Sequence, residues 1–166
     1  FVREARLQGS VSHPGICQVF EVGDDPSSPY IVMQRLHGLP LDEAADGLHL
    51  EQKLVLIRRG AEAVHEAHRT GLIHRDLKPS NIMVEAEGSD PLRPVVLDFG
   101  IARDVGETEM TRAGDLVGTP TYMAPEQMLG EHLDRRADVY ALGATLYRLL
   151  AGRPPFLDEG PATFLK

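Results

Sequence analysis

Two short apolar runs with polar residues at their outer ends constrain the fold of this chain most strongly. The run Ile82–Val84 directly follows Asn81, and the run Val95–Leu97 directly precedes Asp98. The segment between the runs contains the turn-forming sequence 88–91, which is rich in Gly, Ser, Asp and Pro. We therefore expect a β-hairpin that carries Asn81 just before its first strand and Asp98 just after its second.

The polar residues around this hairpin form two motifs, His74-Arg75-Asp76-Leu77-Lys78-Pro79-Ser80-Asn81 and Asp98-Phe99-Gly100. Phosphoryl transfer needs side chains that position and neutralise a phosphate more than it needs covalent chemistry. Asp76 could accept the proton of a substrate hydroxyl or orient that hydroxyl. The Lys78 ammonium would lie where negative charge develops on the transferring phosphate. Asn81 and Asp98 offer the oxygen ligands that Mg²⁺ prefers. Either motif alone would be weak evidence, but both in this order indicate phosphoryl transfer.

These motifs resemble those of the eukaryotic-like Ser/Thr protein kinases, in particular the bacterial members of that family. The segment Gly118–Glu126 looks like the end of an activation segment that begins at Asp98. The resemblance implies an α+β, protein-kinase-like fold. Residues 1–36 would be a partial N-lobe with helix C, the last strands and the hinge, and residues 37–166 would be most of the mainly helical C-lobe.

The resemblance also implies roles for individual residues. Asp76 would be the base, Lys78 would assist transfer, and Asn81 and Asp98 would hold Mg²⁺, which Mn²⁺ could replace. The nucleotide-site residues would be Met33 as gatekeeper, the backbone of Gln34 and Leu36 bonded to adenine, Met83 beneath the adenine ring, and Glu4 paired with the ATP-binding lysine. The implied cofactors are ATP and Mg²⁺, and the implied partner is a protein substrate with a Ser or Thr acceptor.

Further residues match structural and regulatory positions of the family. The structural residues would be His74 stacked on Phe99, Gly100 beside them, Glu126 without its usual arginine partner, and Asp138 holding the catalytic loop through backbone N–H groups. Thr119 would tie the substrate-docking loop to Asp76 and Lys78, which favours Ser/Thr over Tyr substrates. Thr108 and Thr111 would accept a regulatory phosphate, with Arg75 and Arg103 as its cationic partners.

Each of these assignments has a simpler alternative. An aspartate such as Asp138 is favoured at a helix N-terminus by the helix dipole. A strand methionine is more often part of the core than of a ligand site, and a glutamate on a short charged helix is usually solvated. The threonines can be incidental residues of a polar loop. His65 and His68 stand three residues apart on a predicted helix, but no third metal ligand is evident nearby.

Periodicity predicts the remaining elements. Helices are expected over Phe1–Gly9, Glu51–Thr70 and Val139–Leu150, and strands over Ile16–Val22 and Tyr30–Gln34. The apolar face of the 51–70 helix should consist of residues spaced three and four apart, namely Leu54, Ile57, Ala61, Val64 and His68. The 139–150 helix is apolar nearly all round, so it should be buried on most sides and end at Gly152.

Composition is compatible with this interpretation. The chain has 166 residues, of which 42% are hydrophobic, enough for a core. Its net charge of −8 argues against nucleic acid or an anionic membrane as the main partner, because both favour basic surfaces. Cys17 is the single cysteine, which fits a reducing cytoplasm, and no apolar run approaches the length of a membrane span.

The sequence leaves the extent and activity of the protein open. A Gly-rich loop and a Val-Ala-x-Lys strand would normally precede Glu4, and further helices would follow Phe156. We therefore expect an internal fragment of a longer kinase, weakly active or inactive alone, whose full-length form could be membrane-anchored. The alternatives are a pseudokinase scaffold, distinguished by what replaces the lysine, and a small-molecule phosphotransferase of the aminoglycoside type. Lys78 and the 118–126 segment disfavour the second alternative.

Overall fold

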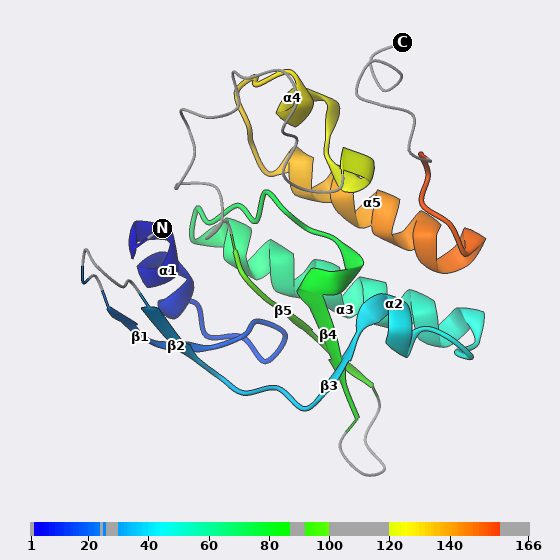
Figure 1. Ribbon diagram of the computed structural model, residues 1–166, viewed down its shortest axis with the longest axis horizontal. Coiled ribbons are helices and arrows are strands. Elements are labelled where there is room, and N and C mark those ends of the chain that lie inside the picture. Colours follow the sequence, from blue (N-terminus) through cyan, green and yellow to red (C-terminus); the bar gives the residue numbers. More distant parts are fainter. Residues whose placement is uncertain (1, 24, 26–29, 87–91, 100–119, 157–166) are drawn as a thin grey trace.

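The computed structural model describes residues 2–23, 25, 30–86, 92–99 and 120–156 (Figure 1). Its elements, in chain order, are α1 (Val2–Gly9), β1 (Val19–Gly23), β2 (Tyr30–Met33), β3 (Gly38–Pro40), α2 (Leu41–Ala44), α3 (Leu50–Arg69), the 3₁₀ turn η1 (Pro79–Asn81), β4 (Ile82–Glu85), β5 (Arg93–Val96), the 3₁₀ turn η2 (Pro120–Tyr122), α4 (Pro125–Met128) and α5 (Arg136–Ala151). The described part is a mixed α/β structure, in agreement with the expected fold class.

The predicted hairpin is present as the antiparallel pair β4 and β5, in which Ile82 lies opposite Val96. Beyond the last paired residues, the Leu97 N–H donates to the Asn81 carbonyl at 2.9 Å. This contact places Asn81 and Asp98 at the same end of the hairpin. The third strand, β3, pairs with β4 and was not predicted, because a three-residue strand containing Gly38 and Pro40 has no alternating pattern.

The first predicted strand, Ile16–Val22, is wrong in its first half. β1 begins only at Val19 and pairs antiparallel with β2, with an irregularity between Val19 and Glu21. Ile16 instead forms a parallel bridge with Val96, and the Cys17 N–H donates to the Val96 carbonyl at 2.9 Å. The apolar run is divided because its first residues pair with β5 and its last residues pair with β2, which the sequence pattern alone could not distinguish.

The long helix α3 matches its predicted length, but its buried face is different. The buried residues are Leu56, Gly60, Ala63, Val64 and Ala67, whereas Leu54 is 43% exposed. Figure 1 shows α3 between the β4–β5 hairpin and α5, and it contacts both. The predicted and observed faces share Val64, and the buried face is the one that packs against these two neighbours, which residue spacing along the helix could not identify.

Helix α5 is buried on one side only among the described residues, so the prediction of burial on most sides is wrong. Its buried residues are Ala137, Asp138, Ala141, Ala144, Thr145 and Leu149, whereas Val139 is 62% exposed and Leu150 is 49% exposed. Among the described elements, α5 packs mainly against α3 and η2. Gly152 ends the helix as predicted, with a φ of 71° and its N–H donated to the Arg148 carbonyl.

The described core surrounds the junction of α3, the hairpin and the segment before β4. Its largest fully buried apolar side chains are Phe99, Leu41, Leu56, Leu77 and Ile82. In the described ranges, no helix combines the length and apolar character that crossing a membrane requires. The core includes Leu77, which belongs to the segment between α3 and β4, so this segment is anchored to the rest of the fold.

Candidate functional site

Residues 74–81, called here the 74–81 loop, lie in the connection between α3, which ends at Arg69, and β4, which starts at Ile82. Within this loop, the Lys78 ammonium lies 2.8 Å from Oδ2 of Asp76. The Asn81 side-chain nitrogen donates to the Asp76 carbonyl at 2.8 Å and to Asp76 Oδ2 at 3.1 Å. The side chains of Lys78 and Asp76 are 26% and 33% exposed, so this cluster is fixed by its neighbours yet open to a ligand.

Asp98 directly follows Leu97, whose N–H donates to the Asn81 carbonyl at the end of the hairpin. Its φ of 51° is in the left-handed region that few non-glycine residues adopt, and its side chain is exposed. Among the described residues, no three His, Cys, Asp or Glu side chains are placed to hold a metal by themselves. Asp98 and the Asn81 amide oxygen nevertheless suit Mg²⁺, which commonly binds one or two protein oxygens together with phosphate and water.

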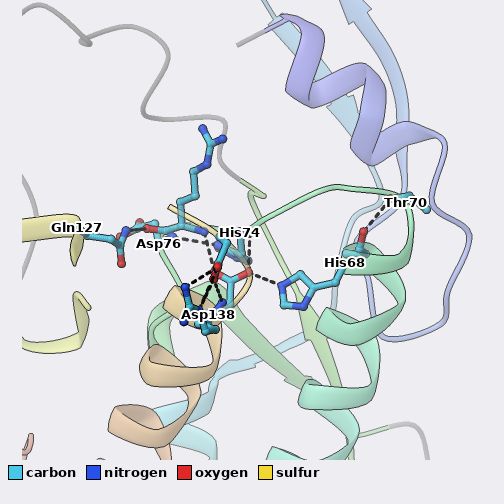
Figure 2. Close-up of polar contacts among 10 residues, drawn as sticks. His68, Thr70, His74, Asp76, Gln127 and Asp138 are labelled. Atoms are coloured by element: carbon cyan, nitrogen blue, oxygen red, sulfur yellow. Dashed lines mark hydrogen bonds and ion pairs between the residues drawn. The ribbon is translucent and has the colours of Figure 1, made fainter. Parts of the chain in front are cut away.

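The carboxylate of Asp138, at the start of α5, holds the 74–81 loop from below (Figure 2). Its Oδ2 accepts the His74 N–H at 2.8 Å, and its Oδ1 accepts the Arg75 N–H at 2.9 Å. The side chain is 1% exposed, so these contacts compensate for the burial of its charge. This is the contact that the family resemblance implied for Asp138. Arg75 itself has a φ of 66°, a strained conformation that needs such support.

His68 is a member of this cluster that sequence reasoning missed. Its Nε2 lies 2.7 Å from Oδ2 of Asp138, so the same carboxylate connects α3, α5 and the loop. The sequence interpretation treated His68 as part of the apolar face of α3. The signal that could have identified it is a titratable residue on an otherwise apolar helix face, which requires a buried polar partner.

The imidazole of His74 is completely buried beneath the loop. Its Nε2 lies 2.8 Å from the Leu97 carbonyl, its Nδ1 accepts the Asp76 N–H at 3.3 Å, and its ring is 4.7 Å from that of Phe99. The expected ring contact is therefore present. Burial lowers the pKa of His74, and the nearby carboxylates of Asp138 and Asp76 offset this only in part. A neutral ring that donates from Nε2 and accepts at Nδ1 satisfies both contacts.

Gln127 is a second residue that sequence reasoning missed. Its amide nitrogen donates to the Arg75 carbonyl at 2.7 Å, and its amide oxygen accepts the Ala124 N–H at 3.1 Å. The side chain is 4% exposed. Glutamine at the third position of a helix often accepts the N–H of the residue before the helix, but no sequence signal indicates its second contact.

The predicted nucleotide-site residues occupy β2, the segment after it, and β4. Met33 ends β2 opposite Val19 and is 37% exposed, and Met83 lies in β4. The Gln34 N–H donates to the Gln18 carbonyl at 2.8 Å, so the Gln34 carbonyl is the atom that could bond adenine. The thiol of Cys17, whose pKa is raised by burial and then by Asp98, lies 3.6 Å from that carbonyl.

The remaining predicted residues are only partly described. Burial raises the pKa of Tyr140 on α5, and the negative charge of Glu126 raises it further. Glu4 lies in α1, but its side chain is outside the described part. The other predicted site residues that lie outside the described ranges are Gly100, Arg103, Thr108, Thr111 and Thr119.

Comparison with known proteins shows which family this chain resembles. The protein kinase domain family model matches residues 1–165. A probable serine/threonine-protein kinase of Corynebacterium efficiens is 43% identical over 170 residues, which cover 97% of this chain and 25% of that protein. The serine/threonine-protein kinase Pkn1 of Myxococcus xanthus is 45% identical over 170 residues, covering 99% of this chain and 24% of Pkn1.

The solved structures that resemble this chain are also protein kinase domains. The crystal structure of the PknI kinase domain of Mycobacterium tuberculosis superimposes with a TM-score of 0.74 and 31% sequence identity, covering 93% of this chain and 57% of that one. The chain thus spans about a quarter of the length of the curated relatives named above.

Proposed function

This chain belongs to the protein kinase family, and we propose that it forms part of the catalytic core of a kinase that transfers the γ-phosphate of ATP to Ser or Thr hydroxyls of proteins. The observation that supports this most directly is the cluster of Asp76, Lys78 and Asn81, with Oδ2 of Asp76 2.8 Å from the Lys78 ammonium. We propose that residues 1–36 and 37–166 are the partial N-lobe and C-lobe.

Asp76 is the proposed base. Its carboxylate is oriented by Lys78 and Asn81 and remains one-third exposed, so a substrate hydroxyl can reach it. Lys78 neutralises charge that develops on the transferring phosphate. General base catalysis of this kind contributes roughly 10²–10⁴-fold in rate.

Asn81 and Asp98 are the proposed Mg²⁺ ligands. The Asn81 amide nitrogen is occupied by Asp76, which leaves the amide oxygen for a cation. Bound Mg²⁺ would neutralise phosphate charge and orient ATP. Met33, Met83 and the Gln34 and Leu36 backbone would contact adenine, and Glu4 would pair with the ATP-binding lysine.

Regulation by phosphorylation is part of the proposal and rests on the sequence alone. A phosphate on Thr111, or less favourably Thr108, would carry about two negative charges and could pair with Arg75 and Arg103. Such pairing orders activation segments. Thr111→Ala in the intact protein should lower activity and raise protease sensitivity of that segment; unchanged values of both would contradict the switch.

The test of the function is a transfer assay with ATP, Mg²⁺ and a basic Ser/Thr peptide, using the intact protein that carries this chain. Asp76→Asn should lower kcat by at least about 100-fold, whereas Asp46→Asn, the same exchange at an exposed site in the turn after α2, should not. Full transfer by the Asp76→Asn protein would contradict the proposed base. Preferential transfer to an aminoglycoside would instead favour a small-molecule kinase.

A further inference from the structure

We propose that Gln127 is a positioning residue of the transfer reaction, which fixes the peptide bond between Arg75 and Asp76 and thereby the place of the Asp76 carboxylate. This inference rests on the proposed function, because it assigns Asp76 a role in transfer. It concerns a residue outside the two motifs that indicated that function.

The amide group of Gln127 joins two segments that are far apart in sequence. Its nitrogen donates to the Arg75 carbonyl at 2.7 Å, and its oxygen accepts the Ala124 N–H at 3.1 Å. One partner is an acceptor and the other is a donor, so only this orientation of the amide satisfies both. With 4% of the residue exposed, water cannot easily replace either contact.

The Arg75 carbonyl matters because its peptide unit continues into Asp76. Arg75 has a φ of 66°, a conformation that is unfavourable for a non-glycine residue and persists only when its surroundings hold it. Asp138 on α5 holds the N–H of Arg75 at 2.9 Å, and Gln127 on α4 holds its carbonyl. Asp138 and Gln127, both labelled in Figure 2, therefore fix the strained Arg75 at its N–H and at its carbonyl.

Loss of the Gln127 contact would free the peptide unit that leads into Asp76. A rotation of that unit moves the Asp76 carboxylate relative to Lys78 and Asn81, which lie 2.8 and 3.1 Å from its Oδ2. Displacing a reacting group by about 1 Å can cost about 100-fold in rate. Gln127 also follows directly on Ala124-Pro125-Glu126, the end of the proposed activation segment. It thereby couples that segment to the proposed base.

The chain contains a matched control for this contact. Gln52 occupies the same third position in α3, and its amide oxygen accepts the His49 N–H at 2.9 Å. It lies at the opposite end of α3 from the 74–81 loop. Gln→Glu keeps the accepting oxygen at both sites and places similar charge at both helix starts. At Gln127 alone, the exchange also removes the donor to the Arg75 carbonyl and puts a carboxylate oxygen against it.

The experiment compares Gln127→Glu with Gln52→Glu in the intact protein that carries this chain. We expect Gln127→Glu to lower kcat by about tenfold or more while KM for ATP changes by less than about twofold. Amide hydrogen exchange of peptides covering residues 74–81 should accelerate in Gln127→Glu and not in Gln52→Glu. Gln127→Leu, which removes both contacts without adding charge, should show the same two effects.

The two measurements separate the possible failures. Unchanged kcat in both Gln127 variants overturns the positioning role, whether or not exchange accelerates. An equal loss of kcat in Gln52→Glu also overturns it, because the effect would then come from charge or helix capping. If the unsubstituted protein transfers no phosphate, the proposed function fails instead, and the exchange comparison alone decides whether Gln127 holds the 74–81 loop.

Discussion

The Nε2 atom of His68 lies 2.7 Å from Oδ2 of Asp138, and both side chains are almost completely buried. The same Oδ2 accepts the His74 N–H at 2.8 Å. Asp138 therefore joins the last turns of α3 and the first turn of α5 to the loop that carries Asp76. Removal of either side chain would leave a buried polar group without one of its partners.

His68→Ala should destabilise the protein. The buried carboxylate of Asp138 would lose its side-chain partner, at a cost of about 1–3 kcal/mol in the free energy of unfolding. Urea denaturation followed by circular dichroism measures this change. His65→Ala, at an exposed position one turn earlier in α3, is the control and should change stability by less than about 0.5 kcal/mol. Equal losses in both variants would show that the Asp138 contact contributes nothing.

The buried imidazole of His74 should make stability depend on pH. Its pKa is lowered in the folded state from an ordinary value of 6.5. Below about pH 6.5 the unfolded chain therefore takes up a proton that the folded protein does not, and stability falls as pH falls, by up to about 1.4 kcal/mol per pH unit.

His74→Phe keeps a ring against Phe99 but cannot titrate. The variant should start from a lower stability at pH 7.5, because it loses the contact with the Leu97 carbonyl. Its further loss between pH 7.5 and 5.5 should be smaller than that of the unsubstituted protein, as measured by urea unfolding at each pH. If the free energy of unfolding depends on pH in the same way for the two proteins, a lowered pKa at this site is ruled out.

Gly38 allows β3 to approach β4 closely. A Cβ built on Gly38 would lie 2.2 Å from the Val84 carbonyl oxygen, which belongs to the paired backbone and cannot move aside. Gly38→Ala should therefore destabilise the protein by about 1–3 kcal/mol. Gly60→Ala in α3 meets no atom within 4 Å and should instead stabilise it by about 0.5–1 kcal/mol. Thermal unfolding of both variants tests whether the two changes in stability have opposite signs. A stabilised Gly38→Ala protein would refute the clash.

Glu85 connects the end of β4 to the segment after β2. Its carboxylate lies 2.5 Å from Arg93 on β5 and accepts the His37 N–H at 2.8 Å, and its side chain is 6% exposed. Arg93→Met would leave this buried charge with one partner fewer. We expect a loss of about 1–3 kcal/mol in the free energy of unfolding.

Arg58→Met is the control for this pair. Arg58 and Glu62 lie 2.6 Å apart, but their side chains are 63% and 55% exposed, so the loss should be below about 1 kcal/mol. A double-mutant cycle of Arg93→Met with Glu85→Gln should give a coupling of at least about 0.5 kcal/mol. A coupling near zero would mean that the short Arg93–Glu85 distance does not stabilise the protein.

The hairpin, the three helices expected from periodicity and the residues around Asp76 were predictable from the sequence because their determinants are local. Among these helices, only the start of α5, at Arg136 rather than Val139, differs by more than one residue. Two apolar strands separated by turn residues place β4 and β5 to within two residues, and Gly152 marks the end of α5 for a conformational reason that needs no neighbours. The polar residues at the ends of the hairpin followed from the same local pattern.

Tertiary structure decided which faces are buried and which distant groups meet. Gly60, Ala63 and Ala67 are buried because α3 lies between the hairpin and α5, and Val139 is exposed because α5 is covered on one side in the described part. The contacts of Asp138 with His68 and of Gln127 with Arg75 join residues separated by 70 and 52 positions. A local pattern carries no information about such pairs, because they form only where the packing of separate helices brings a buried donor and acceptor together.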